Sequence, residues 1–103
     1  GITSAQFVFL GFLPHKKGRE TLFKEIAESK KTVVFYESVH RIEKTLQSLG
    51  EVLTSPRKVA VCRELTKIYE EVVRGDIGEV KNYFFKKKDH LKGEFVVIVE
   101  GRG

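Results

Sequence analysis

Apolar residues recur at helical spacing in two stretches of the chain and predict two amphipathic helices. The first helix spans Arg19–Ser29, and one of its sides is formed by Leu22, Phe23, Ile26 and Ala27. The second follows Ser38, which we expect to act as its N-cap, and ends at Gly50. Its apolar stripe consists of Val39, Ile42, Leu46 and Leu49.

A third helix is predicted after Gly75. Asp76 and Glu79 form a capping-box pattern, in which each side chain bonds to the backbone N–H of the other residue. The apolar residues of this helix are Ile77, Val80, Tyr83 and Phe84. The pattern therefore predicts a helix that begins sharply at its capping box.

Short runs rich in β-branched and aromatic residues predict strands. These runs are Gln6–Leu10, Thr32–Tyr36, Lys58–Cys62, Glu70–Arg74 and Phe95–Val99. Every position of Phe95–Val99 is apolar, so we expect this strand to be covered on both faces. The order of the elements predicts a single layered α/β domain with a mixed sheet of roughly five strands and about three helices.

Length and composition narrow the class of protein. The 103 residues suit one domain, and the longest apolar run is far shorter than the roughly 20 residues of a membrane-spanning helix. The single cysteine, Cys62, excludes a disulfide framework within the chain and favours a reducing, cytoplasmic location. No pair of histidines has the spacing of metal ligands, so we expect no metal site. The net charge of +5 suits an anionic partner, and it equally suits an ordinary basic domain.

The first candidate site lies where a predicted strand meets a predicted helix. Glu37, Ser38, His40 and Arg41 gather there, and ligands of open α/β sheets bind beyond the carboxyl ends of strands. A helix N-terminus at this point also offers unpaired N–H groups to a polar ligand. The alternative is structural, with Ser38 as a cap and His40 and Arg41 in solvent, and the spacing alone favours it.

Two further candidates flank other strands. Glu64 follows a strand and is suited to orient Arg41 or a ribose hydroxyl, unless Arg63 and Glu64 simply pair with each other. The segment Gly93-Glu94-Phe95 precedes the last strand. Glycine lets a backbone approach a ligand closely, although a plain turn explains this segment equally well.

Two basic clusters are candidates for contacts with phosphates. The first contains His15, Lys16, Lys17 and Arg19, and the second contains Lys81, Lys86, Lys87, Lys88 and Lys92. Charged loops are as often merely solvated, so the sequence leaves both interpretations open.

Four blocks of residues occur in a characteristic order: Gly11–Arg19, Val34–Arg41, Arg63–Lys67 and Gly93–Val96. Together they resemble the C-terminal half of the bacterial 16S rRNA cytidine 2′-O-ribose methyltransferase family, a branch of the tetrapyrrole (corrin/porphyrin) methylase superfamily. The similarity covers nearly the whole chain, although the family usually has proline in place of Val39. The family's N-terminal domain with its Gly-rich cofactor loop has no counterpart here. The resemblance thus implies that residues 1–103 are the C-terminal α/β domain of a two-domain methyltransferase.

The resemblance implies that S-adenosyl-L-methionine binds in a cleft between the two domains, of which this chain supplies one wall. The residues implied near the cofactor are Tyr36, Glu37, Ser38, Glu64, Leu65, Thr66, Gly93, Glu94 and Phe95. The residues implied on the RNA side are Lys16, Lys17, Arg19, His40, Arg41, Arg63, Lys86, Lys87 and Lys88. A base near the ribose 2′-hydroxyl would assist methyl transfer. Glu37, Glu64 and His40 are only weak candidates, because the base can also lie in the other domain.

The same resemblance implies small-subunit ribosomal RNA as the substrate, an N-terminal domain and a homodimer as partners, and no membrane. The domain on its own is expected to be inactive. Two alternatives stay open: a non-catalytic nucleic-acid-binding or dimerisation module of the same fold, and a methylase of a tetrapyrrole-type small molecule.

Overall fold

The computed structural model describes residues 7–54, 57–64, 70–86 and 94–102. The elements follow one another as β1 (Phe7–Phe12), α1 (Arg19–Glu28), β2 (Thr32–Ser38), α2 (Ile42–Val52), β3 (Val59–Glu64), β4 (Glu70–Gly75), α3 (Ile77–Lys86) and β5 (Glu94–Val99). This order and the α/β class confirm the sequence prediction. No helix in the described ranges combines the length and apolar character needed to cross a bilayer.

The five strands form one mixed sheet in the order β1-β2-β5-β3-β4. β1 runs parallel to β2, whereas β5 is antiparallel to both of its neighbours, β2 and β3, and β4 is antiparallel to β3. The last strand of the chain therefore lies in the middle of the sheet. As a result, β2 and β3 point in the same direction and end at the same edge.

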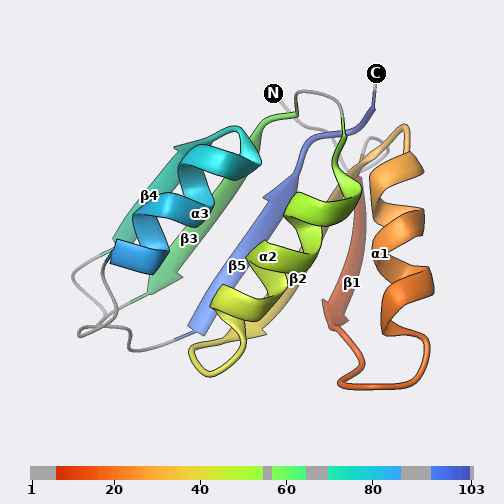
Figure 1. Ribbon diagram of the computed structural model, residues 1–103, viewed down its shortest axis with the longest axis horizontal. Coiled ribbons are helices and arrows are strands. Elements are labelled where there is room, and N and C mark those ends of the chain that lie inside the picture. The colour runs from red at the N-terminus through yellow and green to blue at the C-terminus, as the bar shows by residue number, and fades with distance from the viewer. Residues whose placement is uncertain (1–6, 55–56, 65–69, 87–93, 103) are drawn as a thin grey trace.

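All three helices cover one face of the sheet (Figure 1). Along β5, Phe95, Val97 and Val99 are buried, while the residues between them are only partly buried. The expectation that β5 is covered on both faces is therefore wrong for this chain. Apolar residues on both sides of a strand indicate that each side meets apolar neighbours, but they do not require helices on both sides.

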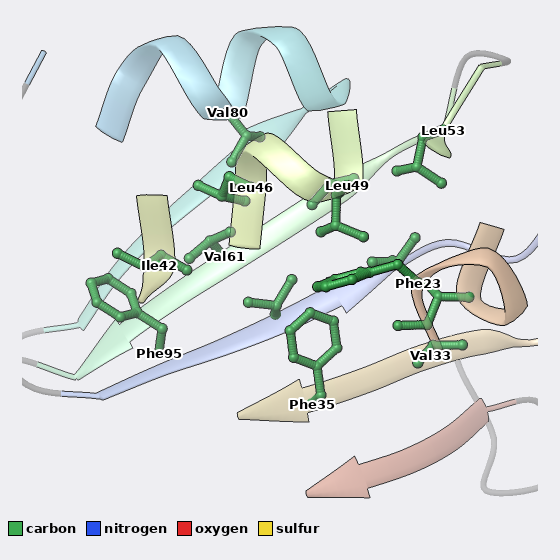
Figure 2. Packing of buried hydrophobic residues seen from close by; sticks show 14 of the residues in the cluster. Phe23, Val33, Phe35, Ile42, Leu46, Leu49, Leu53, Val61, Val80 and Phe95 are labelled. Atoms are coloured by element: carbon green, nitrogen blue, oxygen red, sulfur yellow. The ribbon is translucent and has the colours of Figure 1, made fainter. Parts of the chain in front are cut away.

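The hydrophobic core fills the space between the sheet and the helices (Figure 2). Ile42, Leu46 and Leu49 of α2 have no exposed surface, as the predicted stripe requires. Val80 and Phe84 bring α3 into the same core, and the ring of Phe84 packs edge-on against Phe95 with 5.5 Å between centroids. Each apolar side chain that is fully buried contributes about 1.5–3 kcal/mol to the stability of the fold. These contacts therefore hold the helices firmly on the sheet.

β1 extends further than expected because Gly11 lies inside the strand. The strand was predicted to end before this residue, but it continues to Phe12 with a shift of register between Phe9 and Phe12. Gly11 has a φ of 67° there, a conformation that costs an L-residue with a side chain considerably more. Glycine thus permits a bulge that carries the strand on instead of ending it.

The predicted cap of α2 is wrong, and the predicted cap of α3 is confirmed. Ser38 is the last residue of β2 and does not cap α2; a turn follows it, closed by a hydrogen bond from Arg41 N–H to the Ser38 carbonyl at 3.1 Å. The capping box of α3 is formed as predicted, since Glu79 N–H donates to Asp76 Oδ1 at 2.9 Å and Asp76 N–H donates to Glu79 Oε1 at 3.2 Å. The backbone hydrogen bond from Glu79 lowers the pKa of Asp76.

Candidate functional site

Three strand ends that the sequence singled out meet at one edge of the sheet. The register pairs Glu37 with Phe95 and Ser38 with Glu94, between β2 and β5. It also pairs Arg63 with Phe95 and Glu64 with Glu94, between β5 and β3. The central position of β5 therefore joins the ends of β2 and β3, which are far apart in the sequence, into one candidate site.

The side chains at this edge point alternately to the two faces of the sheet. Glu37 and Phe95 are buried on the face that the helices cover. Tyr36 and Glu94 are exposed on the open face, and Ser38 is half-buried there. Because neighbouring strand residues alternate in this way, only the second group offers side chains to a ligand on the open face.

Glu37 lies in a buried hydrogen-bonded network. Its side chain is 3% exposed, Oε1 accepts a hydrogen bond from Ser38 N–H at 2.8 Å, and Oε2 accepts one from the Thr45 hydroxyl at 2.5 Å. Both carboxylate oxygens are thus used inside the protein. This arrangement suits a group that fixes the end of β2 rather than one that exchanges protons with a substrate.

Arg19 belongs to the same network. The guanidinium donates from Nη2 to the Thr45 hydroxyl at 2.8 Å and from Nη1 to the Pro14 carbonyl at 3.1 Å, and it lies 4.8 Å from the ring centre of Phe23. The side chain is only 8% exposed, and burial lowers its pKa. Arg19 therefore holds the loop before α1 in place instead of presenting its charge to a nucleic acid.

Arg63 is likewise committed to the protein interior. It forms an ion pair with Glu71 of β4 at 2.6 Å, and Glu71 also accepts a hydrogen bond from the Tyr83 hydroxyl of α3. The suggested partner Glu64 follows Arg63 in the strand, and its side chain lies outside the described part of the chain. Glu71 instead lies directly across the β3–β4 pairing from Arg63.

The remaining basic candidates are more accessible. Lys16, Lys17 and His40 are exposed in the loops that follow β1 and β2, Arg41 is half-buried, and Lys86 is exposed at the end of α3. The other residues suggested for the site, Leu65, Thr66, Gly93, Lys87 and Lys88, lie outside the described part of the chain, as does the side chain of Glu64. Of these accessible candidates, all but Lys86 lie in the loops that follow β1 and β2.

Thr45 belongs to the network of Glu37 and Arg19, although the sequence pattern did not single it out. It precedes Leu46 and lies on the buried side of α2, with no exposed surface. A polar residue within an apolar stripe is a usable signal, because a buried hydroxyl requires a partner. Its partners, however, come from two other elements and are fixed only by the tertiary structure.

The exposed side chains of the candidate edge, Tyr36 and Glu94, line none of the three hollows found on the described surface. These hollows have volumes of about 330, 460 and 420 Å³, and the third is lined in part by Lys16 and Arg19. The first two lie toward the opposite edge of the sheet, and the third lies between α1 and α2. A small ligand at Tyr36 and Glu94 would therefore need a second surface to enclose it.

Comparison with known families supplies the context for this edge. The profile of the family described as Tetrapyrrole (Corrin/Porphyrin) Methylases matches residues 2–81. The chain belongs to this family. A solved structure titled as the cobalamin biosynthetic enzyme cobalt precorrin-4 methyltransferase, CbiF, shares the fold with a TM-score of 0.63 at 12% identity, over 91% of this chain and 39% of that one.

Sequence relatives at higher identity are ribosomal RNA methyltransferases. This tetrapyrrole methylase domain is 43% identical to the ribosomal RNA small subunit methyltransferase I of Halalkalibacterium halodurans, over 100% of this chain and 35% of that protein. It is 41% identical to the enzyme of the same name from Haemophilus influenzae, over 99% of this chain and 36% of that protein. The chain thus spans about a third of the length of the curated relatives it matches.

Proposed function

We propose that residues 1–103 form the C-terminal domain of an S-adenosyl-L-methionine-dependent 2′-O-ribose methyltransferase that acts on small-subunit ribosomal RNA. The observation that carries this proposal is the identity of 43% with a ribosomal RNA small subunit methyltransferase over the whole chain. The meeting of β2, β5 and β3 at one edge supports it, because the blocks of the family resemblance fall there. An N-terminal domain, a homodimer and a cytoplasmic location are parts of the same proposal.

The exposed residues of the edge fit one wall of a cofactor cleft. Tyr36 offers an aromatic surface and Ser38 a hydroxyl, while Glu94 supplies a negative charge that favours a cationic ligand. S-adenosyl-L-methionine, when bound, supplies a methyl group on a positively charged sulfur.

Catalysis by this domain would rest on positioning. Methyl transfer is an in-line displacement, so holding donor and acceptor in line lowers the barrier most. The network of Glu37, Thr45 and Arg19 is suited to this task because it fixes the end of β2 and the loop before α1 relative to each other. Among the base candidates, His40 is exposed in the turn after β2, whereas both oxygens of Glu37 are occupied.

A chimeric enzyme tests this proposal. The matching segment of the Halalkalibacterium halodurans methyltransferase is replaced by this chain, and transfer of labelled methyl groups to small-subunit ribosomal RNA is measured. We expect the chimera to transfer methyl groups, and we expect Glu94→Gln within it to raise the KM for S-adenosyl-L-methionine several-fold by removing the charge beside the donor. Glu100→Gln is the matched control, because Glu100 is exposed beyond the other end of β5.

A folded chimera that transfers no methyl group to the RNA contradicts the proposed function. Calorimetric titration of the isolated chain with S-adenosyl-L-methionine provides a second test. We expect weak or undetectable binding, because only one wall of the cleft is present. Tight binding by the isolated chain would exclude a cleft shared between two domains.

Methylation of a tetrapyrrole is less well supported. The likeness to cobalt precorrin-4 methyltransferase rests on 12% identity, which supports a common fold and no common substrate. The chimera distinguishes the two functions, since a tetrapyrrole methylase domain would not restore transfer to ribosomal RNA.

A further inference from the structure

Three aromatic rings lie in contact on the open face of the sheet. Phe9 and Phe12 of β1 flank Tyr36 of β2, with ring centroids 5.1 Å and 5.3 Å from that of Tyr36. Their exposed fractions are 52% for Phe9, 56% for Phe12 and 37% for Tyr36. An aromatic cluster of this kind that is left in water is typical of a binding surface.

Basic residues occur in the loops that lead from these two strands toward the helices. The loop that follows Phe12 carries His15, Lys16 and Lys17, and the turn that follows Tyr36 carries His40 and Arg41. Both loops leave the sheet at the edge where β1 and β2 end (Figure 1). Aromatic faces and positive charge therefore occur together at this end of β1 and β2.

At the same edge, acidic residues occur on the side of β2 that faces away from β1. Glu94 pairs with Ser38 from the β5 side, and Glu64 continues the same register row on β3. Among the described side chains, Glu94 thus places a negative charge where β5 begins, whereas the loops after β1 and β2 carry positive charge. A polyanion approaching the edge is favoured over β1 and β2 and disfavoured over the centre of the sheet.

Exposed aromatic rings together with basic loops favour unpaired nucleotides, rather than a second copy of the chain, as the ligand of this surface. A nucleotide has a flat base that stacks on aromatic side chains and a phosphate that attracts lysine and arginine. A second copy would bring another net charge of +5 toward the same basic loops. Charge complementarity therefore points to a nucleic acid as the occupant of this surface.

We propose that Phe9, Phe12 and Tyr36 form a stacking platform for unpaired bases of the RNA substrate, with Lys16 and Lys17 on the adjoining phosphates. The choice of RNA rests on the function proposed above. This inference assigns the ring of Tyr36 to the RNA, and it leaves the neighbouring Ser38 and Glu94 for the methyl donor. The platform recognises single strands, because a paired base cannot present its face.

A fluorescent reporter tests the platform directly, because the protein contains no tryptophan. Phe12→Trp introduces one indole into the platform, and Val72→Trp is the matched control, since Val72 is exposed on the open face of β4. Each variant is titrated with a single-stranded RNA of about ten nucleotides, with its duplex form and with S-adenosyl-L-methionine. We expect the single strand alone to quench Phe12→Trp strongly and to leave Val72→Trp unchanged.

A second pair of variants measures affinity in the otherwise natural chain. Replacing both rings, as Phe9→Leu with Phe12→Leu, keeps the surface apolar and removes the π faces. We expect this change to weaken binding of the single strand about tenfold or more, at an unchanged salt dependence. Replacing Val72→Leu should leave the affinity as it is.

The outcomes separate the platform from the proposed function. Salt-dependent RNA binding without quenching of Phe12→Trp overturns the platform and leaves the function standing. Absence of any RNA binding overturns the platform, whereas the proposed function is overturned only by a folded chimera that transfers no methyl group. Quenching by S-adenosyl-L-methionine alone would assign the rings to the methyl donor, and an emission change that follows protein concentration without RNA would assign them to self-association; either result overturns the platform.

Discussion

Glu37, Thr45 and Arg19 connect three elements through a single hydroxyl group. The Thr45 hydroxyl accepts a hydrogen bond from Arg19 and donates one to Glu37, so it separates two buried and opposite charges while satisfying both. Burying a charged group costs several kcal/mol unless it is paired and hydrogen-bonded. The hydroxyl of Thr45 is therefore the group on which the whole network depends.

Removing this hydroxyl should destabilise the protein markedly. Thr45→Val keeps the shape of the side chain but removes the partner of Glu37 Oε2 and of Arg19 Nη2, so we expect a loss of about 1–3 kcal/mol in the free energy of unfolding. Urea denaturation followed by circular dichroism measures this loss. Thr45→Ser is the control because it keeps the hydroxyl, and equal stability of the Val and Ser variants would show that the network contributes nothing.

At the scale of the element, β1 shows how one glycine extends a strand. Gly11 adopts a φ of 67°, and a Cβ placed there would meet no atom within 4 Å. Any cost of substitution at this position is therefore a cost of backbone conformation and not of crowding. The bulge that Gly11 permits keeps Phe12 beside Tyr36, as their register pairing shows.

Substitution of Gly11 should thus reveal the backbone cost alone. We expect Gly11→Ala to lower the free energy of unfolding by about 1–2 kcal/mol, because an L-residue resists this left-handed conformation. Gly11→Asn should cost less, since asparagine tolerates the conformation better. Thermal unfolding of both variants provides the measurement, and a harmless Gly11→Ala would mean that β1 rearranges without the bulge.

The elements themselves were largely predictable, because most of them depend on local patterns. The stripes of α1 and α2 and the capping box of α3 each lie within a few residues of sequence. The start of α2 was not predictable in the same way, since Ser38 is a good cap by type and is used by β2 instead. Pairing with Glu94 of β5 keeps Ser38 in the sheet, and that partner is distant in the sequence.

At the scale of the whole molecule, the candidate site depends on contacts that no local pattern reveals. The resemblance grouped Glu37, Glu64 and Glu94, and the register of β2, β5 and β3 explains why such distant residues share one edge. The residue types alone could not predict which of the basic residues are buried. Arg19 and Arg63 belong to charged motifs, yet both are buried and each is engaged by a partner from another element.

The positions of the accessible lysines predict how RNA binding should depend on salt. Replacing Lys16→Gln with Lys17→Gln removes two charges beside β1, so we expect weaker RNA binding and a salt dependence reduced by about 0.7 in log–log slope for each phosphate contact that is lost. Fluorescence anisotropy at several salt concentrations measures the slope. The matched control is Lys30→Gln with Lys31→Gln, an exposed pair between α1 and β2; equal effects of the two pairs would indicate attraction by net charge alone.

The central position of β5 has a consequence for how the protein assembles during synthesis. The strand pairs β1–β2 and β3–β4 are linked within the sheet only through β5, which leaves the ribosome after all of them. Until then, two half-sheets expose unpaired backbone along their inner borders. Completion of the sheet must await β5, and a truncation that removed it would leave two half-sheets joined through the packing of α2 against α3 instead of one continuous sheet.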